Sequence, residues 1–150
     1  GISKSMIIIA HRANLEGRNP ETENHPDQIL RAIEEGFDVE VDAWFEDGEW
    51  YIGHDEVKYE VKPSFFSRVL NPIEDKLWIH AKNLEAVEKL RLSGMNWFWH
   101  EKDKVTITSR GYIWCFPGYE VDGGIMVEFE QKTDKDIIGV CTDNPIRWKK

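Results

Sequence analysis

The chain has 150 residues, about the size of one domain, and 41% of them are hydrophobic, which is enough to form a core. Its 19 basic and 28 acidic residues give a formal net charge of -9, which argues against a nucleic-acid partner and against attraction to anionic membranes. No apolar stretch approaches the length that crosses a bilayer, and no secretory pattern opens the chain. We therefore expect a cytoplasmic protein without a membrane anchor.

A single domain is expected over residues 1–150, with residues 1–5 a cloning remnant ahead of Met6. Cys115 and Cys141 both lie in apolar runs, where reduced, buried thiols are more common than a disulfide. Free thiols also favour a cytoplasmic setting. The oligomeric state is left open by the composition.

A buried strand is the first predicted element. Residues 6–10 (MIIIA) form a continuous apolar run, typical of a strand buried on both faces, and the run ends in His11 and Arg12. Barrel and doubly wound enzymes place their chemistry at the carboxyl ends of such strands. A histidine in this position is more often a satisfied core residue, but the adjacent Arg12 favours a functional role.

A helix is predicted next, after a polar loop. Pro26 suits its first position, apolar residues recur on one face, and Gly36 can end it. A second strand follows, so strand, helix and strand form a βαβ unit whose parallel strands end at the same rim. His11 is therefore expected to lie near the polar residues of the second strand.

The stretch Phe37–Glu56 carries the strongest chemical signal. Alternation along a strand places Glu40 and Asp42 on one face and Val39 and Val41 on the other. Two carboxylates side by side are unfavourable unless a cation lies between them, and hard cations such as magnesium or calcium prefer oxygen ligands. A solvated acidic hairpin is the alternative interpretation.

The turn of this hairpin decides where His54 lies. A two-residue loop at Asp47 and Gly48 places His54 beside Val41, on the face opposite the carboxylates. A three-residue loop, Glu46 to Gly48, places His54 opposite Glu40, and Gly48 supplies the left-handed residue that this loop needs. We predict the three-residue loop.

The third strand of the parallel set is predicted over residues 77–81 (LWIHA). His80 and Lys82 share one side at its end, and Asn83 can cap a helix that ends near Gly94. A short helix over Ser64–Leu70 is a further expectation. Three successive strands thus deliver polar pairs to one rim.

These segments resemble the glycerophosphodiester phosphodiesterase family, a branch of the phosphatidylinositol-phospholipase-C-like phosphodiesterases with a TIM-barrel fold. The resemblance rests on "IIIAHRA", "ETENHPDQILRAIEEGFDVEVDAWFEDGEWYIGHDE" and "LWIHAKN", and the final "IIGVCTDNP" is similar to that family's last strand. The ordered set His-Arg, Glu-Asn, Glu-x-Asp and His-Asp is far more specific than any one pair.

The resemblance implies a role for each matched residue. The acid and base would be His11 and His54, the metal ligands Glu40 and Asp42, the phosphate contacts Arg12 and Lys82, and the supporting residues Glu23 and Asp55. Glu23 would help to order His11 or the metal ligands, although His25 replaces the threonine of the family's Glu-Asn-Thr signature.

Two departures from the family pattern affect this transfer. His80 stands where the family has a glutamate as third metal ligand, and imidazole suits manganese, zinc or iron better than magnesium or calcium. We therefore expect one divalent ion, magnesium, calcium or manganese, on Glu40, Asp42 and His80. The second departure is size, because a (β/α)8 barrel typically takes about 250 residues.

The second half of the chain reads as strands with short connections. They are predicted over residues 96–100, 105–108, 112–116, 124–129 and 137–141, with no convincing helix between residues 96 and 132. We predict an α/β fold, a shortened TIM-like barrel that lacks several outer helices on this side. His100, at a strand end, is a candidate extra ligand or a structural residue, and Trp114 is a candidate apolar wall or a core residue.

The predicted activity is metal-dependent hydrolysis of a small-molecule phosphodiester of the glycerophosphodiester type, with one histidine as base and the other as acid. A catalytically silent phosphate-binding domain on the same fold is the alternative, suggested by the missing glutamate and the missing helices.

Overall fold

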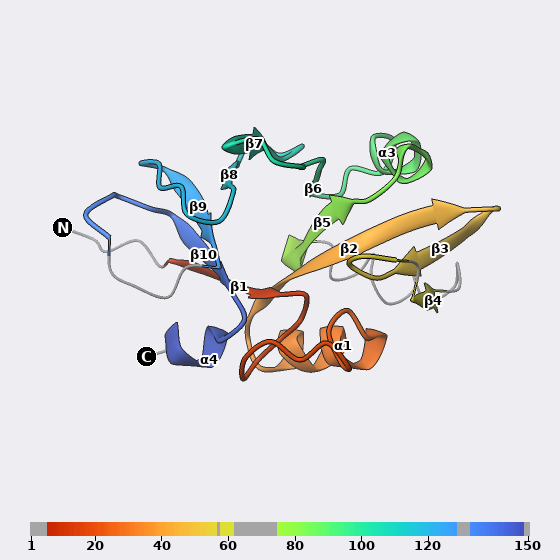
Figure 1. Ribbon diagram of the computed structural model, residues 1–150, viewed down its shortest axis with the longest axis horizontal. Helices are drawn as coiled ribbons and strands as arrows, with labels where there is room; N and C mark the ends of the chain where they lie inside the picture. Colours follow the sequence, from red (N-terminus) through yellow and green to blue (C-terminus); the bar gives the residue numbers. More distant parts are fainter. Residues whose placement is uncertain (1–5, 57, 62–74, 129–132, 149–150) are drawn as a thin grey trace.

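A curled, mixed sheet of ten strands organises the protein, which a computed structural model describes over residues 6–56, 58–61, 75–128 and 133–148 (Figure 1). The strands are β1 (Ile7–His11), β2 (Asp38–Glu46), β3 (Glu49–Ile52), β4 (Tyr59–Val61), β5 (Leu77–Ala81), β6 (Trp97–Phe98), β7 (Val105–Ile107), β8 (Ile113–Cys115), β9 (Gly124–Val127) and β10 (Gly139–Thr142). They follow the order β4-β3-β2-β1-β10-β9-β8-β7, and β5 pairs with both β2 and β6.

Parallel pairing runs through β6, β5, β2, β1, β10, β9 and β8, whereas β3, β4 and β7 lie antiparallel to their neighbours. The helices among the described residues are α1 (Pro26–Glu34), α3 (Leu84–Leu90) and α4 (Pro145–Trp148). Helix α1 packs on β2, α3 on β2 and β5, and α4 on β1. Within the described ranges no helix combines the length and the apolar character needed to cross a membrane.

The shortened TIM-like barrel expected from the resemblance is wrong. A (β/α)8 barrel covers each strand with a helix, but in the described part of the chain helices follow β1, β5 and β10 only. Residues 116–123, which join the parallel strands β8 and β9, are too few for a crossover helix. The protein is a sheet-dominated half-barrel with few helices (Figure 1).

The βαβ unit predicted in the first half is confirmed. Strands β1 and β2 are parallel and α1 connects them. Helix α1 starts at Pro26, whose fixed φ suits the first position, and the His25 ring accepts the Asp27 N–H as its cap. Gly36, with φ of 96°, follows its end.

Other local predictions have mixed outcomes. Asn83 caps α3 by accepting the N–H of Ala86, as predicted, but α3 ends at Leu90, before Gly94. The predicted hairpin of the second half is present as β7 and β8. The predicted helix over Ser64–Leu70 lies outside the described residues.

The turn between β2 and β3 has two residues, so the three-residue prediction is wrong. The register pairs Glu46 with Glu49, which leaves Asp47 and Gly48 as the turn. Their φ angles of 49° and 80° match a type I′ turn, whose twist fits the right-handed twist of the strands. Strand β3 ends at Ile52, so His54 lies beyond the paired residues and the pairing does not determine its face.

Apolar side chains fill both sides of the sheet. The inner cluster joins strands from the whole curl: Ile9, Trp78, Phe98, Trp114, Ile125, Val127 and Cys141. A second cluster lies between the sheet, α1 and α3 and includes Val39 and Val41. The Ser109 N–H donates to the Trp97 carbonyl at 2.7 Å, which holds the β7–β8 hairpin against β6.

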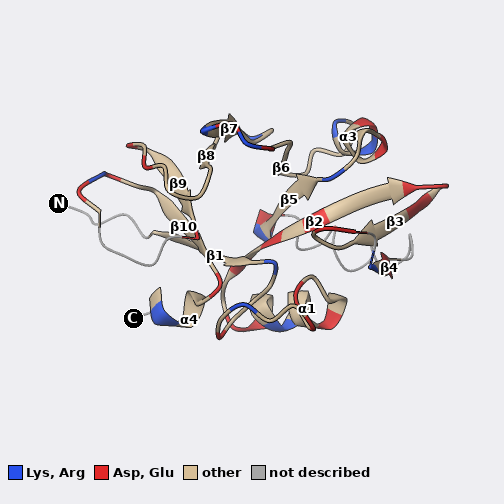
Figure 2. Ribbon diagram, in the orientation of Figure 1, with Lys and Arg blue, Asp and Glu red and all other residues tan. Residues whose placement is uncertain are grey.

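Charged residues of both signs are interspersed along the described chain, and acidic positions occur within β2 at the centre of the sheet (Figure 2). Both cysteines are buried and free, as predicted.

Candidate functional site

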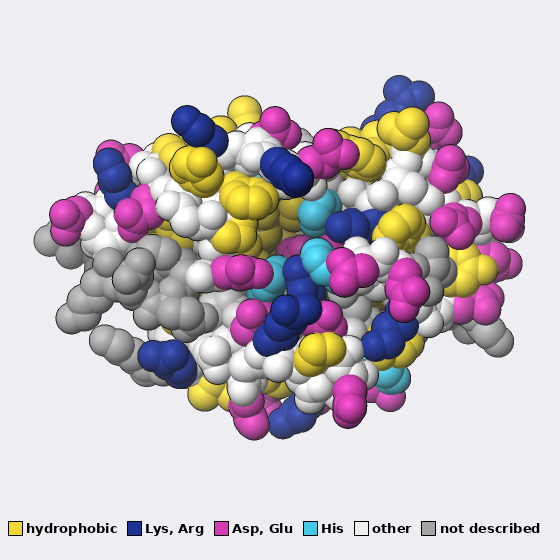
Figure 3. All heavy atoms as spheres, in the orientation of Figure 1, with side chains coloured by type: hydrophobic (Ala, Val, Ile, Leu, Met, Phe, Trp, Pro, Cys, Tyr) yellow, Lys and Arg dark blue, Asp and Glu magenta, His cyan; other side chains and the backbone are white. Residues whose placement is uncertain are grey.

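A cavity of about 780 Å³ opens at the carboxyl ends of β1 and β5 and over the middle of β2. Figure 3 shows histidine side chains gathered there beside acidic and basic ones, with hydrophobic side chains along one border. Its lining includes His11, Arg12, Glu40, Asp42, His54, His80, Lys82, His100, Trp114, Phe116, Pro117 and Glu128. The residues singled out in the sequence therefore converge on one hollow, apart from Glu23 and Asp55, which stand beside it.

Sheet register explains the convergence. In the parallel pairing, His11 lies opposite Glu40, and Asp42 lies opposite His80. Side chains at paired positions project from the same face of a sheet. The grouping of these residues is thus a direct result of the parallel register of β1, β2 and β5.

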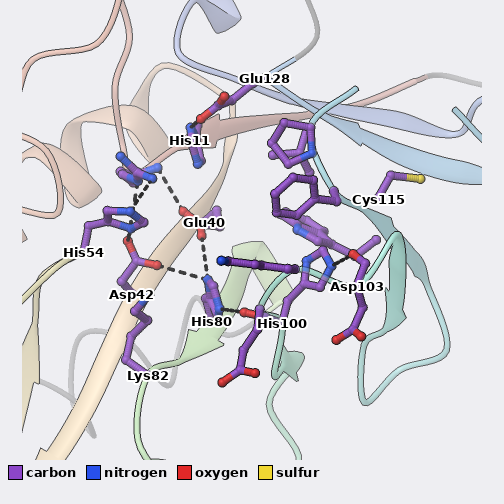
Figure 4. A pocket seen from close by; sticks show the side chains of 17 residues that line it. His11, Glu40, Asp42, His54, His80, Lys82, His100, Asp103, Cys115 and Glu128 are labelled. Carbon is purple, nitrogen blue, oxygen red and sulfur yellow. Dashed lines mark hydrogen bonds and ion pairs between the residues drawn. The ribbon is translucent and has the colours of Figure 1, made fainter. Parts of the chain in front are cut away.

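Three of them form a cluster of potential metal ligands. The His80 Nδ1 lies 3.3 Å from Asp42 Oδ1 and 3.8 Å from Glu40 Oε2, and one donor atom from each residue lies within 4.8 Å of the others (Figure 4). Two ligands about 2.1 Å from one ion are about 3.0–4.2 Å apart at angles of 90° to 180°. The two separations from His80 are in that range, and Asp42 Oδ1 is a buried acceptor without a hydrogen bond.

The Asp42 carboxylate is held in place by its neighbours. The Asn24 side-chain amide donates to Oδ2 at 3.0 Å, and its side-chain oxygen Oδ1 accepts the backbone N–H of Asp42 at 3.1 Å. Burial alone would raise the pKa of Asp42, but His54, His80 and Lys82 hold it well below its usual range. Asp42 is therefore ionised in the folded protein.

Glu40 has the opposite shift. Burial, and then the charge of Asp42, raise the pKa of Glu40 above its usual value, and the nearby cationic groups only partly offset them. Its Oε1 accepts the backbone N–H of Arg12 at 3.2 Å. The pair thus consists of one strongly ionised carboxylate and one that burial makes a better proton acceptor.

Arg12 lies at the centre of a polar network. Its backbone adopts a left-handed conformation with φ of 54°, as does Ala13 with φ of 65°, so the chain turns sharply after β1. Its guanidinium lies 3.6 Å from Glu23 and 3.7 Å from Asp42. Burial would lower the pKa of Arg12, but the charges of Glu40 and Asp42 outweigh it and raise the pKa.

His54 reaches the same network from the segment after β3. Its Nε2 lies 2.9 Å from Arg12 Nη2 and must accept, because a guanidinium has no acceptor. The neutral ring then carries its proton on Nδ1, which lies 3.4 Å from Asp42 Oδ2. His54 therefore faces Asp42 despite the two-residue turn, because the chain leaves the β-ladder before it.

His11 is oriented by residues that the sequence interpretation missed. Its Nδ1 bonds Asp143 Oδ1 at 3.1 Å, and Asn14 donates to the same oxygen at 2.9 Å. Glu128, which has φ of 54° directly after β9, brings a second carboxylate within 3.9 Å of the ring. Burial would lower the pKa of His11, but the Asp143 bond and the charge of Glu40 outweigh it, and the pKa is raised.

Three residues that the sequence interpretation missed have a signal in the sequence. Glu128 and Asp143 lie near the end of a predicted strand, which is the criterion that identified His11, and Asn24 lies within the quoted "ETEN". Asn14 has no such signal, because it lies in the loop after β1.

For four of the site residues predicted from the sequence, the position in the structure limits the role that each can have. The His100 ring bonds the carbonyl of Asp103 at 2.6 Å and does not join the metal-ligand cluster. Trp114 is 3% exposed and stacks on Phe98, so it is a core residue at the base of the cavity. Asp55 is exposed, with an oxygen 3.4 Å from His54 Nε2.

Glu23, the fourth, lies beside Arg12 and Arg18. It therefore orders the guanidinium of Arg12, whereas the sequence interpretation had assigned it to His11 or the metal ligands.

Comparison with known protein families, with curated proteins and with solved structures gave no match.

Proposed function

We propose that the protein is a metal-dependent phosphodiesterase that cleaves phosphodiesters of the glycerophosphodiester type. The observation that carries this proposal is the placement of three metal-ligand side chains, two histidines and two cationic side chains around one cavity. The motif resemblance supports the same chemistry, because each matched pair lies at this cavity or beside it.

The residues present fit a divalent metal ion. Glu40, Asp42 and His80 would hold it, and Asp42 Oδ1 is buried there without a hydrogen-bond donor. When bound, the ion supplies positive charge for a phosphate oxygen and lowers the pKa of a neighbouring hydroxyl or water.

Arg12 and Lys82 bind the phosphate in this proposal. Both line the cavity, and the buried Arg12 Nε has no hydrogen-bond acceptor. A guanidinium can bind phosphate through two parallel hydrogen bonds, whereas lysine acts as a point charge. Together they offset the negative charge of a phosphodiester in a site that also contains carboxylates.

His11 and His54 transfer the protons. One ring accepts the proton of the attacking hydroxyl as its oxygen bonds to phosphorus, and the other protonates the departing alkoxide. His11 is prepared for either role, because Asp143 holds Nδ1 and leaves Nε2 available. His54 becomes available when Arg12 turns to the phosphate, since its Nε2 accepts from Arg12 in the absence of substrate.

The test is turnover of bis(p-nitrophenyl) phosphate and glycerophosphocholine with added manganese or magnesium, and its loss with a chelator. We expect His11→Ala and His54→Ala each to lower kcat by about 10²–10⁴-fold. His25→Ala is the matched control, because His25 caps α1 away from the cavity. Equal activity of all three variants would contradict the proposal.

A catalytically silent phosphate-binding domain is the second candidate. The hydrogen bond between Arg12 and His54 favours this candidate. While it is formed, His54 cannot accept a proton through Nε2, and one nitrogen of Arg12 is not available to phosphate. Phosphate binding without turnover at any metal concentration would support this candidate over the enzyme.

A further inference from the structure

The orientation of the His80 ring distinguishes this site. Its Nε2 lies 2.9 Å from the backbone carbonyl oxygen of His100. A carbonyl only accepts hydrogen bonds, so Nε2 carries a proton. The ring also stacks on Phe98, with centroids 4.9 Å apart and planes 24° apart, which restricts its rotation. The neutral ring therefore presents a lone pair at Nδ1.

That lone pair faces two carboxylates. Nδ1 lies 3.3 Å from Asp42 Oδ1, a buried oxygen that accepts no hydrogen bond. Glu40 Oε2 is 3.8 Å from the same nitrogen. Three electron-rich atoms therefore lie close together. This arrangement is favourable only when a cation, either a proton or a metal ion, lies between them.

The second partner of the ring is typical of a metal-binding histidine. Such a residue donates its other ring N–H to a carbonyl or carboxylate, which fixes the tautomer and the ring plane. Here the His100 carbonyl accepts that hydrogen bond, from a loop that lines the cavity. The side chain of His100 is not needed for it.

We propose that this site selects a transition-metal ion of the manganese, cobalt and zinc class over magnesium and calcium, with His80 Nδ1 as one ligand. Imidazole nitrogen binds these ions well, whereas magnesium and calcium prefer a shell made entirely of oxygen. The proposal rests on the metal site of the proposed function but not on turnover.

The test measures binding to the chelator-treated protein by isothermal titration calorimetry with Co²⁺, Mn²⁺, Mg²⁺ and Ca²⁺. We expect Co²⁺ to bind at least about tenfold more tightly than Mg²⁺. His80→Glu should lower that ratio by about tenfold or more, because it replaces nitrogen with oxygen. His80→Asn, which adds no charge, should also lower the ratio of Co²⁺ to Mg²⁺ affinity. It replaces His80→Glu in the test if His80→Glu does not fold.

His100→Gln is the matched control, since it removes a second imidazole from the cavity and keeps the backbone carbonyl. We expect it to leave the Co²⁺ to Mg²⁺ ratio unchanged. In ¹⁵N spectra of the histidine side chains, Zn²⁺ should shift the Nδ1 signal of His80 and not that of His100.

The outcomes separate this inference from the proposed function. Equal Co²⁺ and Mg²⁺ affinities, or a ratio that His80→Glu leaves unchanged, would overturn the inference even if magnesium supports turnover. Selective Co²⁺ binding without turnover would sustain the inference and remove the enzyme proposal. Failure of every ion to bind would overturn both.

Discussion

Glu40 and Asp42 lie two residues apart on one strand, yet their surroundings shift their pKa values in opposite directions. Two adjacent carboxylates, taken alone, predict that removing the charge of Asp42 relieves repulsion and costs little stability. The structure reverses this expectation, because Asn24, Arg12 and His54 all lie around Asp42. Glu40 is the member of the pair whose charge burial makes unfavourable.

In the metal-free protein at pH 7, we expect Asp42→Asn to lower the free energy of unfolding by about 3 kcal/mol, since it removes one of the two carboxylates that lie beside the buried Arg12 guanidinium. Glu40→Gln should cost less, and its Oε1 can still accept the Arg12 N–H. Urea unfolding of both variants measures the difference. Equal losses would contradict the assigned directions of the two shifts.

The pH dependence has a definite sign. The folded pKa of Asp42 lies below its unfolded value, so its stabilising contribution is present above about pH 3.9 and is lost as the pH falls through the folded pKa. The stability advantage of the wild type over Asp42→Asn should therefore shrink only in strong acid.

His11 and Asp143 form a second linked pair. The folded pKa of His11 is raised, so its contribution is fully present below about pH 6.5 and is lost as the pH rises through the folded pKa. We expect Asp143→Asn to destabilise the protein by about 1.5–3 kcal/mol near pH 5.5, the range for hydrogen bonds to charged groups, and by less near pH 9.

Urea unfolding at the two pH values, with the exposed Asp134→Asn as control, tests this prediction. An NMR titration should also show a lower pKa for His11 in the Asp143→Asn protein. A loss of stability that is independent of pH would mean that Asp143 holds the Asn14 loop and does not act through the charge of His11.

At the scale of elements, the β2–β3 hairpin connects His54 to β2, the strand of Glu40 and Asp42. Gly48 has φ of 80°, and a Cβ there would meet nothing within 4 Å, so Gly48→Ala costs only backbone strain. Gly53, beside His54, has φ outside the left-handed region, but a Cβ there would clash with the Glu56 carbonyl oxygen. The same substitution thus has two different physical effects on one hairpin.

We expect Gly48→Ala to lower the free energy of unfolding by about 1–2 kcal/mol and to leave turnover unchanged. Gly53→Ala should displace the segment that carries His54 and lower turnover as well as stability. Thermal unfolding and phosphodiester turnover of both variants give the comparison. Normal turnover in Gly53→Ala would show that the position of His54 does not depend on this turn.

At the scale of the whole molecule, the site is built from residues on neighbouring strands in the middle of the sheet. Glu40, Asp42 and His80 lie on the paired strands β2 and β5, and His11 lies on β1. An ion that binds all three ligands binds the folded state and not the unfolded chain. We therefore expect metal binding to stabilise the entire half-barrel through the sheet.

We expect saturating metal at 100 times its Kd to add about 2.7 kcal/mol to the stability, which raises Tm by about 5–10 °C for a chain of this size. A chelator should reverse the shift, and Asp42→Asn should abolish it. Scanning calorimetry measures both. A Tm that does not respond to metal would remove the metal site from the proposal.

The sequence by itself determined the local elements of the first half and the rim on which the polar residues meet. Apolar runs, Pro26 and the Asn83 cap are short-range signals, and parallel pairing of β1 and β2 follows from the βαβ order. Strand alternation then places Glu40, Asp42 and His80 on one face regardless of what covers the other. These inferences depend only on neighbouring residues and chain order.

Tertiary structure decided the half-barrel, the position of His54 and the partners of His11. The resemblance implied a barrel with a helix after each strand. Helices cannot cover the whole sheet, because some connections between its strands are too short to contain one. His54 reaches Asp42 because the chain leaves the ladder after Ile52, which strand periodicity does not describe. Asp143 meets His11 from 132 residues away because β10 pairs with β1, and pairing at that distance depends on the closure of the whole sheet.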